Sequence, residues 1–218
     1  AILGVSSHSL DQYATKIQSH YQMHDLILPD APKLQLSHII NRVRNRKLIY
    51  ETWGFFEKSS YGNGTAMIFA GPPGTGKTMA AQIMAAELGM ELYRIELPAV
   101  VDKYIGETEK KLNRIFNEAE RSMAILFFDE ADELFSKRTE VKESNDKYSN
   151  MEIAFLLQKM EEYDGVSILA TNYLQNFDNA FRRRVSDIIS FPMPDANMRL
   201  QMWQSMIPER LPISDEID

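Results

Sequence analysis

Gly71-Pro72-Pro73-Gly74-Thr75-Gly76-Lys77-Thr78 is the stretch that decides the fold of this chain, and it fits G-x-x-x-x-G-K-[ST] without a mismatch. The apolar run 66–70 before it has the length and content of a buried strand. Apolar residues then recur at helical spacing, at Ala80, Ile83, Met84 and Leu88. Because glycines leave no Cβ in the way, successive N–H groups can converge on phosphate oxygens at the start of a helix. The order strand, loop, helix therefore predicts a phosphate-binding loop, with a plain glycine turn as the alternative.

A second set of polar residues follows the apolar run 124–128, which ends in Asp129-Glu130. In a nucleotide site, Lys77 would neutralise the β- and γ-phosphates and the Thr78 hydroxyl would ligate Mg²⁺. Asp129 is then the expected anchor of the metal, and Glu130 is the residue that orients and polarises the attacking water. An acidic pair that caps the next helix is the alternative, but its position downstream of the loop favours the nucleotide role. Asp132 and Glu133, further along the same segment, are expected to be solvated or interfacial.

Strands alternate with amphipathic helices along most of the chain. The expected strands are 66–70, 91–96, 123–128, 166–170 and 187–191, and two of the helices between them are expected at 108–121 and 151–162. Elements in this order form βαβ units, whose ligands bind at the carboxyl ends of the strands. The sequence therefore predicts a P-loop NTPase fold of three α/β/α layers with a mainly parallel five-stranded sheet.

The composition is that of a globular protein. Hydrophobic residues make up 44% and charged residues 25% of the 218 residues. No apolar run approaches the roughly 20 residues of a membrane span, and no signal peptide opens the chain, so a cytoplasmic location is expected. The absence of cysteine excludes disulfides and thiolate zinc sites.

The charge balance argues against nucleic acid as the main partner, because the formal net charge is −7. One basic cluster interrupts the acidic background, at Arg42, Arg44, Arg46 and Lys47. A solvated helix face is the favoured interpretation of this cluster, and a local nucleic-acid contact is the alternative.

The N-terminal segment is expected to lie outside the nucleotide-binding domain. Over residues 9–22, four apolar or aromatic residues share one helical face: Leu10, Tyr13, Ile17 and Tyr21. We therefore expect a helical extension or linker over residues 1–24 and the nucleotide-binding domain over residues 25–218.

Two polar motifs follow the later strands. Asn172 stands just beyond the strand 166–170, where an amide can reach a γ-phosphate or the attacking water; a turn-forming asparagine is the alternative. Arg182-Arg183-Arg184 then put three consecutive cations into an acidic protein. They form either an exposed helix end or a source of positive charge for the transition state at a neighbouring subunit's nucleotide.

Together these motifs resemble the AAA branch of the AAA+ ATPase family. GPPGTGKT at 71–78 is similar to its Walker A loop, and FFDEAD at 127–132 is similar to its Walker B strand. ATN at 170–172 is similar to its sensor-1 position, and DNAFRRRV at 178–185 is similar to its arginine-finger turn. The resemblance extends over about residues 25–210.

The resemblance implies that the ligand is ATP with Mg²⁺. The choice of adenine over guanine as the base rests on the resemblance alone. It implies metal-side roles for Thr78 and Asp129, and catalytic roles for Lys77, Glu130 and Asn172. The implied nucleotide contacts run from the loop into the next helix and to the Walker B strand: Gly71, Pro72, Pro73, Gly74, Thr75, Gly76, Lys77, Thr78, Met79 and Asp129.

The resemblance also implies an arginine finger. On the family pattern Arg183 and Arg184 take the finger positions, with Arg183 preferred. Arg182 stands where relatives often have an apolar residue, and this departure leaves the assignment within the triplet open.

Lys103-Tyr104-Ile105-Gly106-Glu107 is similar to the aromatic, hydrophobic and glycine pore loop with which AAA remodellers grip a polypeptide. Tyr104 and Ile105 are the implied contacts, because an exposed aromatic side chain can contact many sequences through area and stacking. A packing role for Tyr104 is the alternative. The polar segment 137–149 occupies the position of a second pore or intersubunit loop.

Finer features look like bacterial AAA proteins that are associated with phage-tail-like contractile injection particles. These features are WGF at 53–55, before the Walker A loop, KYIGETEK at 103–110, DEADELF at 129–135 and LLQKMEEYDG at 156–165. AAA modules continue into a small helical lid with a sensor-2 residue, and this sequence stops near where that lid would begin. The expected object is therefore the large α/β subdomain with the lid mostly absent.

Two functions are consistent with these motifs. The first is hydrolysis of Mg²⁺-ATP by an ATPase that remodels or threads a protein partner. This ATPase is expected to self-associate into a ring, most simply a hexamer. The second is a low-turnover, ATP-binding scaffold component of a contractile injection particle. A nucleic-acid motor is disfavoured by the net charge and by the aromatic loop at 103–107, and a GTP switch is disfavoured because no N-K-x-D motif occurs.

Overall fold

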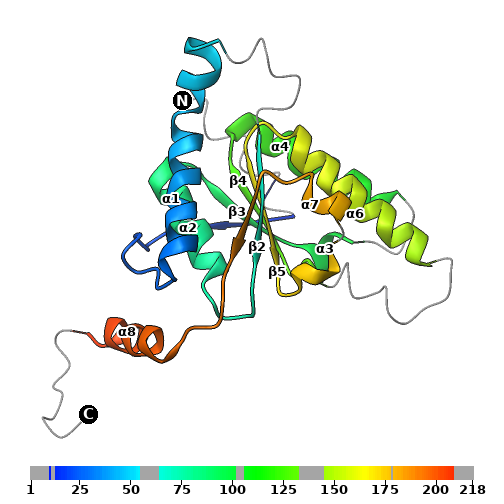
Figure 1. Cartoon of the computed structure of the whole chain (residues 1–218). Helices are drawn as coiled ribbons and strands as arrows, with labels where there is room; N and C mark the ends of the chain where they lie inside the picture. The colour runs from blue at the N-terminus through cyan, green and yellow to red at the C-terminus, as the bar shows by residue number, and fades with distance from the viewer. Residues whose placement is uncertain are drawn as a thin grey trace, which may run out of the picture.

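A six-stranded sheet is the centre of the fold, in a computed structural model that describes residues 10, 13–54, 64–101, 106–132, 145–177 and 179–208 (Figure 1). The strand order is β1-β3-β4-β5-β2-β6. Their bounds are Thr15–Ile17 (β1), Thr65–Ala70 (β2), Leu92–Glu96 (β3), Ile125–Asp129 (β4), Val166–Thr171 (β5) and Asp187–Ser190 (β6). All neighbours from β3 to β6 pair in parallel, whereas β1 pairs antiparallel with β3. The five predicted strands are the five parallel ones, so the predicted fold class is confirmed, with one further edge strand.

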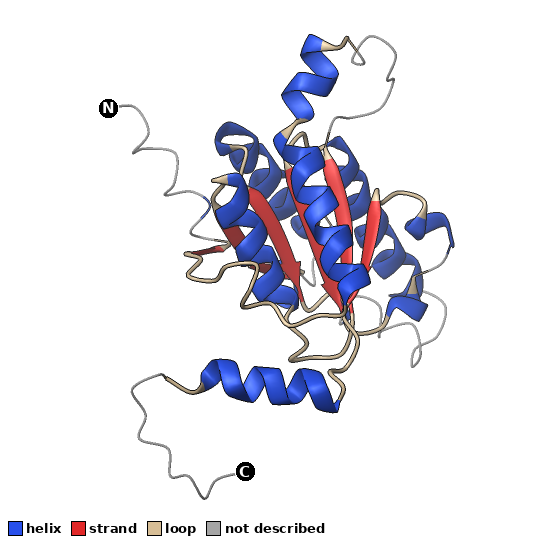
Figure 2. Ribbon diagram, turned by 60° about the vertical axis from the view of Figure 1, so that its left-hand side comes forward, coloured by secondary structure: helices blue, strands red, loops and turns tan. Residues whose placement is uncertain are grey.

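Helices cover both faces of the sheet (Figures 1 and 2). One face carries α1 (Asp30–Arg44) and α2 (Lys77–Leu88). The other face carries α3 (Leu97–Val100), α4 (Glu107–Ser122) and α6 (Asn145–Glu162). The remaining elements are η2 (Leu48–Thr52), η4 (Leu174–Asn176), α7 (Asn179–Arg182) and α8 (Ala196–Met206), and α8 lies apart from the layers.

Strand β4 illustrates how the two apolar layers fix the strands. Phe127 packs into the layer formed with α1 and α2, and Phe128 packs into the opposite layer, where its ring lies 5.5 Å from the ring of Phe116 on α4. Both phenylalanines are fully buried, and burial of such a side chain contributes about 1.5–3 kcal/mol. Because β4 is held from both sides, Asp129 emerges at a fixed point at its carboxyl end.

The helix predicted over residues 9–22 is wrong for the part that the structure describes. Thr15–Ile17 is strand β1, in register with Leu92 to Arg94 of β3. An extended segment can satisfy the open edge of β3 with main-chain hydrogen bonds, and the β-branched Thr15 and Ile17 favour a strand. Leu10 and Ala14 are buried against the layer of α4 and α6. The rest of the predicted division, with the main domain over 25–218, stays a prediction.

Two expected boundaries also shift. Strand β4 starts at Ile125 rather than at residue 123, because Met123 has φ 50° and ends α4. Helix α6 starts at Asn145, six residues before the expected start. The predicted pore-loop residues Tyr104 and Ile105 lie outside the described residues, as does most of the polar segment 137–149.

Candidate active site

The loop between β2 and α2 is held between two neighbouring strands. The N–H of Gly71 donates to the carbonyl of Thr171 on β5, at 3.0 Å. A Cβ on Gly71 would lie 2.0 Å from the carbonyl oxygen of Phe191, so only glycine fits where the loop leaves β2. Gly76 has φ 97° and precedes α2, whose N-terminus has no side-chain cap. The loop therefore leads directly to a helix N-terminus with free N–H groups, as an anion site requires.

Lys77 is directed across the loop by its hydrogen bonds. Its ammonium donates to the carbonyl of Gly71, to the carbonyl of Pro72 at 3.0 Å and to Oδ1 of Asn172 at 2.9 Å. Burial lowers the pKa of Lys77, and the carboxylates of Asp132 and Asp129 oppose this shift. A half-buried ammonium of this kind gains from an anionic partner, because the partner offsets the cost of desolvation.

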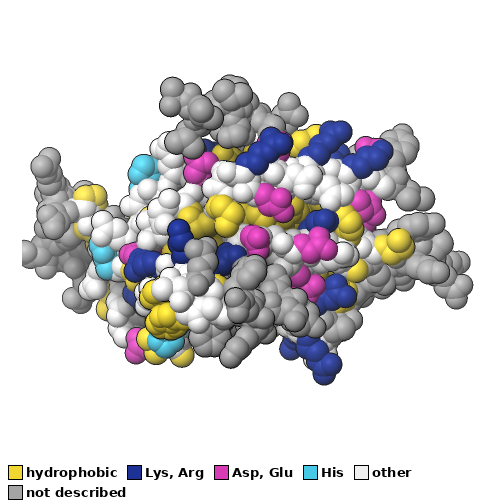
Figure 3. Space-filling model, turned by 90° about the horizontal axis from the view of Figure 1, so that it is seen from above, with side chains coloured by type: hydrophobic (Ala, Val, Ile, Leu, Met, Phe, Trp, Pro, Cys, Tyr) yellow, Lys and Arg dark blue, Asp and Glu magenta, His cyan; other side chains and the backbone are white. Residues whose placement is uncertain are grey.

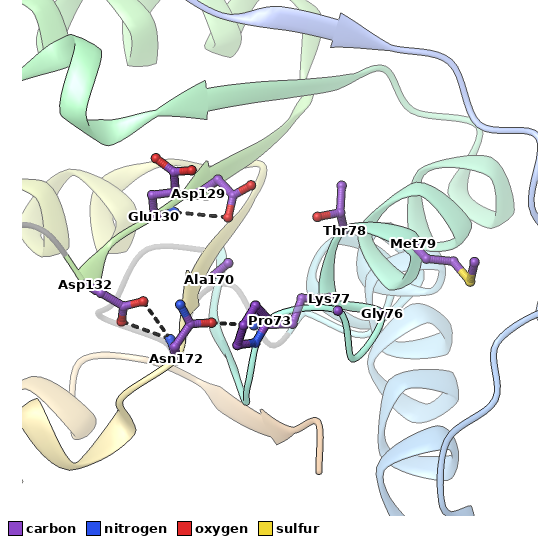
Figure 4. Close-up of a pocket in the computed structure, with 11 residues that line it drawn as sticks. Pro73, Gly76, Lys77, Thr78, Met79, Asp129, Glu130, Asp132, Ala170 and Asn172 are labelled. Atoms are coloured by element: carbon purple, nitrogen blue, oxygen red, sulfur yellow. Dashed lines mark hydrogen bonds between the residues drawn. The ribbon is translucent and has the colours of Figure 1, made fainter. Parts of the chain in front are cut away.

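A cavity of about 440 Å³ lies in front of this ammonium, at the carboxyl ends of β2, β4 and β5 (Figure 4). Nine of the predicted site residues line it, together with Asp132 and Ala170. The predicted ones are Pro73, Gly74, Gly76, Lys77, Thr78, Met79, Asp129, Glu130 and Asn172. Residues that are up to 99 positions apart in the sequence, Pro73 and Asn172, thus meet at one edge of the sheet.

The other three predicted loop residues shape the loop rather than line the cavity. Gly71 and Pro72 supply the carbonyls that accept from Lys77. Thr75 is buried, and its hydroxyl donates to the carbonyl of Pro72 at 2.8 Å. These bonds within the loop keep its backbone curved around the ammonium.

Asp129 is fixed at both of its carboxylate oxygens. Oδ2 accepts from Nε and Nη2 of Arg94, at 3.0 and 2.9 Å, and Oδ1 accepts from the N–H of Glu130, at 3.0 Å. Arg94 lies on β3, which pairs with β4. Arg94 was not predicted from the sequence. The only signal for it was a charged residue within the strand predicted at 91–96, which the structure places next to β4.

Glu130 has an unusual backbone for a residue other than glycine, with φ 59°. This left-handed conformation costs roughly 1–2 kcal/mol, and such conformations concentrate at functional sites. The residue is exposed, and it lines the cavity beside Asp129. An accessible carboxylate beside the cavity is suited to contact water there.

Asp132 was expected to be solvated or interfacial, and the structure corrects this. Its carboxylate accepts from the N–H of Asn172 (Figure 4). It also accepts from the hydroxyl of Thr171 and from the N–H of Tyr173. Asp132 thereby connects the segment after β4 with the segment after β5, and both segments line the cavity. The available signal was its position three residues after Asp129, just beyond the predicted strand. Glu133 lies outside the described residues.

The three arginines have different environments, and among the described residues none of them lines the cavity. Arg182 donates from Nε to the carbonyl of Phe177 at 3.2 Å and from Nη2 to the carbonyl of Leu174 at 3.0 Å, so it stabilises the turn before α7. Arg184 lies 4.0 Å from Glu161, and Arg183 is exposed. The side chain that departs from the family pattern is thus used within the chain itself.

The three arginines of the basic cluster near the end of α1 pair with acidic side chains. Arg42 pairs with Asp187, Arg44 pairs with Glu87 at 2.9 Å, and Arg46 pairs with Asp164 at 3.5 Å. In the view of Figure 3, basic and acidic side chains are mixed over the described surface that it shows. These ion pairs fit a solvated helix face, and a local nucleic-acid contact stays the alternative.

The donor set of the cavity fits Mg²⁺ bound together with phosphates. Magnesium keeps several waters and uses one or two protein oxygens besides phosphate oxygens. Thr78 and Asp129 both line the cavity, and a hydroxyl and a carboxylate are oxygen ligands of this kind. Within the described ranges, no group of three or more His, Cys, Asp or Glu side chains forms an all-protein metal site.

In the described part of the chain, no helix combines the length and the apolar character that crossing a membrane requires.

The chain is similar in sequence to known AAA proteins. An AAA family ATPase of Sinorhizobium fredii is 31% identical over 186 residues, which are 85% of this chain and 54% of that protein. A 26S proteasome regulatory subunit 6B homolog of Dictyostelium discoideum is 34% identical over 160 residues, which are 70% of this chain and 39% of that protein. The chain thus spans about half of the first relative and less of the second.

The fold agrees with a solved structure as well. The crystal structure of the FIGL-1 AAA domain superposes with a TM-score of 0.68, at 21% identity, and covers 92% of this chain and 64% of that one. Residues 67–193 match the family described as "ATPase family associated with various cellular activities (AAA)". Since this match covers more than half of the chain and includes every cavity-lining residue, the chain belongs to the AAA family of ATPases.

Proposed function

We propose that this chain binds ATP with Mg²⁺ and hydrolyses the bond between its β- and γ-phosphates. The observation that carries the proposal is the shared cavity: the Lys77 ammonium, the Thr78 hydroxyl, and the side chains of Asp129, Glu130 and Asn172 line it from three separate segments. Membership of the AAA family supports the same activity.

Each side chain has a role that suits its position. Lys77 and the helix N-terminus would hold the β- and γ-phosphates, and Thr78 with Asp129 would hold the magnesium. Glu130 would orient and polarise the attacking water, and the amide of Asn172 would contact the γ-phosphate or that water. Bound Mg²⁺ would neutralise charge on the phosphates during the transfer.

The arginines support a ring, because Arg183 is exposed and is absent from the cavity of its own chain. We propose that Arg183, with Arg184 as the second candidate, reaches the nucleotide of a neighbouring copy in a ring, expected to be a hexamer. A cation supplied in this way stabilises the charge that develops in the transition state. Arg182 is not part of this proposal, since its guanidinium binds backbone carbonyls of its own chain.

The proposed partner of the ring is a protein that it remodels or threads. The motif around Tyr104 and Ile105 carries this step, and one relative is by name a regulatory subunit of the 26S proteasome. A cytoplasmic location stays part of the proposal.

Turnover with a matched pair of variants tests the hydrolysis step. Phosphate release from Mg²⁺-ATP is measured for the unchanged chain, for Glu130→Gln and for Glu118→Gln, a surface pair partner of Arg121 on α4. Loss of a general base lowers the rate about 10²-fold or more, so we expect that loss for Glu130→Gln alone. Equal turnover in all three proteins would exclude Glu130 from the reaction.

Light scattering tests the ring. Glu130→Gln, which should retain ATP, is measured with and without the nucleotide. We expect a nucleotide-driven increase in mass towards a ring, reduced by Arg183→Ala and less by Arg182→Ala where the latter folds. A monomer under all conditions would count against the intersubunit arginine.

The second candidate function is a low-turnover ATP-binding scaffold of a contractile injection particle. It rests on the finer sequence features at 103–110, 129–135 and 156–165. The turnover experiment separates the two candidates, because the low turnover of a scaffold would hardly change in Glu130→Gln.

A further inference from the structure

Asp132 gathers more hydrogen bonds than its exposed neighbours in the cavity. Oδ1 accepts from the hydroxyl of Thr171, from the N–H of Asn172 at 2.9 Å and from the N–H of Tyr173 at 3.3 Å. Oδ2 also accepts from the N–H of Asn172, at 3.0 Å. We propose that Asp132 is a positioning residue that holds the Asn172 amide in place to read the γ-phosphate. This inference rests on the proposed function of Asn172.

The sheet itself does not hold Asn172. The parallel pairing of β5 with β2 ends at Thr171, opposite Ala70, and the pairing with β4 ends at Leu169. Asn172 is therefore the first residue beyond the ladder, and its backbone and that of Tyr173 need other acceptors for their N–H groups. The Asp132 carboxylate is that acceptor for Asn172, and it shares the N–H of Tyr173 with the hydroxyl oxygen of Thr171, which accepts at 3.1 Å.

Thr171 connects this carboxylate to the phosphate-binding loop. Its side chain is buried, and its hydroxyl donates to Asp132. Its carbonyl accepts from the N–H of Gly71, where the loop begins. Thr171 thus has one hydrogen bond to the loop and another to Asp132. These two bonds fix the distance between the loop and the backbone of Asn172.

The side chain of Asn172 completes the connection. Its Oδ1 accepts from the Lys77 ammonium at 2.9 Å (Figure 4). Both residues line the cavity. With the amide oxygen directed at Lys77, the amide NH₂ group is the donor that an anionic oxygen would meet. Holding the backbone of Asn172 therefore sets the position of a donor in the cavity, which a surface turn would leave variable.

A purely structural role would make a different prediction. If Asp132 only joined the ends of β4 and β5, its loss would lower stability and would change the binding of every nucleotide to the same degree. A positioning role changes the binding of the nucleotide that has a γ-phosphate more than the binding of the one that lacks it. The ratio of the two affinities thus separates the roles, and it requires no turnover.

The experiment measures dissociation constants of Mg²⁺-ADP and of a non-hydrolysable Mg²⁺-ATP analogue for the unchanged chain and for five variants. These are Asn172→Ala, Asp132→Ala, Asp132→Asn, the double variant Asp132→Ala with Asn172→Ala, and Tyr163→Phe. The last removes the buried hydrogen bonds of the Tyr163 hydroxyl to the carbonyls of Ala124, at 2.6 Å, and Ala119, at 3.3 Å. These bonds lie at the opposite end of β4, so Tyr163→Phe is a control that lowers stability away from the cavity.

We expect Asn172→Ala to lower the preference for the ATP analogue about tenfold, as loss of one hydrogen bond to a charged group does. Asp132→Ala should lower it by a similar factor, and the double variant should lose no more than either single variant, because the two residues act through one contact. Asp132→Asn should lose less, since one acceptor oxygen remains. Tyr163→Phe should keep the preference of the unchanged chain.

The inference is overturned if Asn172→Ala changes the preference while the Asp132 variants do not, or if the two losses multiply in the double variant. Should Asp132→Ala fail to fold, an unchanged preference in Asp132→Asn overturns it. No change in Asn172→Ala would overturn it together with the sensor role of Asn172. Absence of nucleotide binding by the unchanged chain would instead contradict the proposed function itself.

Discussion

The guanidinium of Arg94 lies against the carboxylate of Asp129, with Nε 3.0 Å and Nη2 2.9 Å from the same oxygen, Oδ2. The two residues come from the adjacent strands β3 and β4. The other oxygen of Asp129 accepts the N–H of Glu130. The carboxylate that we propose as the magnesium anchor therefore has a cation of the chain itself beside it.

Removal of this cation should strengthen magnesium binding. Like charges near a protein surface repel each other by about 1 kcal/mol or more, which is roughly a fivefold change. We expect Arg94→Met to lower, by about that factor, the Mg²⁺ concentration at which ATP binding is half-maximal. Arg94→Lys keeps the charge and should change it less. A higher Mg²⁺ requirement in Arg94→Met would mean that Arg94 serves mainly to orient Asp129.

Two glycines of the loop should differ in their tolerance of alanine. A Cβ at Gly71 would meet the carbonyl of Phe191 at 2.0 Å, whereas a Cβ at Gly74 would have nothing within 4 Å. Gly71→Ala should therefore cost more than about 3 kcal/mol of unfolding free energy, because the clash is with backbone. Gly74 has φ 77°, so Gly74→Ala should cost only about 1–2 kcal/mol. Urea unfolding measures both, and equal losses would show that the approach to Phe191 relaxes freely.

The contact between β1 and β3 should depend on pH. The ammonium of Lys16, with a smaller contribution from the hydroxyl of Tyr93, lowers the pKa of Glu91 below its ordinary value of 4.5. A carboxylate whose pKa is lower in the folded state stabilises the fold above pH 4.5, and this contribution is lost as the pH falls through the folded value. Because the pair is exposed, its contribution should stay under about 1 kcal/mol.

Thermal unfolding of Glu91→Gln tests this contact. The variant should melt below the unchanged chain at pH 7, and the difference should shrink as the pH falls below 4.5. Lys16→Met should show the same loss at pH 7, and adding it to Glu91→Gln should change little. A difference in melting temperature that is constant from pH 7 to pH 3 would contradict the assignment.

Local spacing was sufficient to predict the loop and most of the sheet. The loop from Gly71 to Thr78 is contiguous, so its glycines, lysine and threonine could be assigned before any tertiary contact was known. The five parallel strands are apolar or alternating runs between helices, and each was predicted within two residues of its observed ends. Since carboxyl ends of parallel strands share one edge, the meeting of Asp129, Glu130 and Asn172 with Lys77 was predictable as well.

Contacts between distant segments could not be predicted in this way. Arg94 pairs with Asp129 only because β3 and β4 are neighbours in the sheet. The sequence of either strand does not determine this order. Asp132 acquires its partners from the segment after β5, about 40 residues away in sequence. Residues 9–22 have helical spacing, but the open edge of β3 offers main-chain hydrogen bonds to a strand at Thr15–Ile17.

The central claim is that the loop before α2 holds the phosphates of a nucleotide. Calorimetric titration of Mg²⁺-ATP into the unchanged chain, Lys77→Ala and Lys159→Ala tests it most directly, with Lys159 as a lysine that pairs with Glu162 on α6. We predict one nucleotide per chain, with affinity lowered at least about tenfold by Lys77→Ala and unchanged by Lys159→Ala. Equal affinity for Lys77→Ala and the unchanged chain, or no binding by the unchanged chain, would contradict the claim.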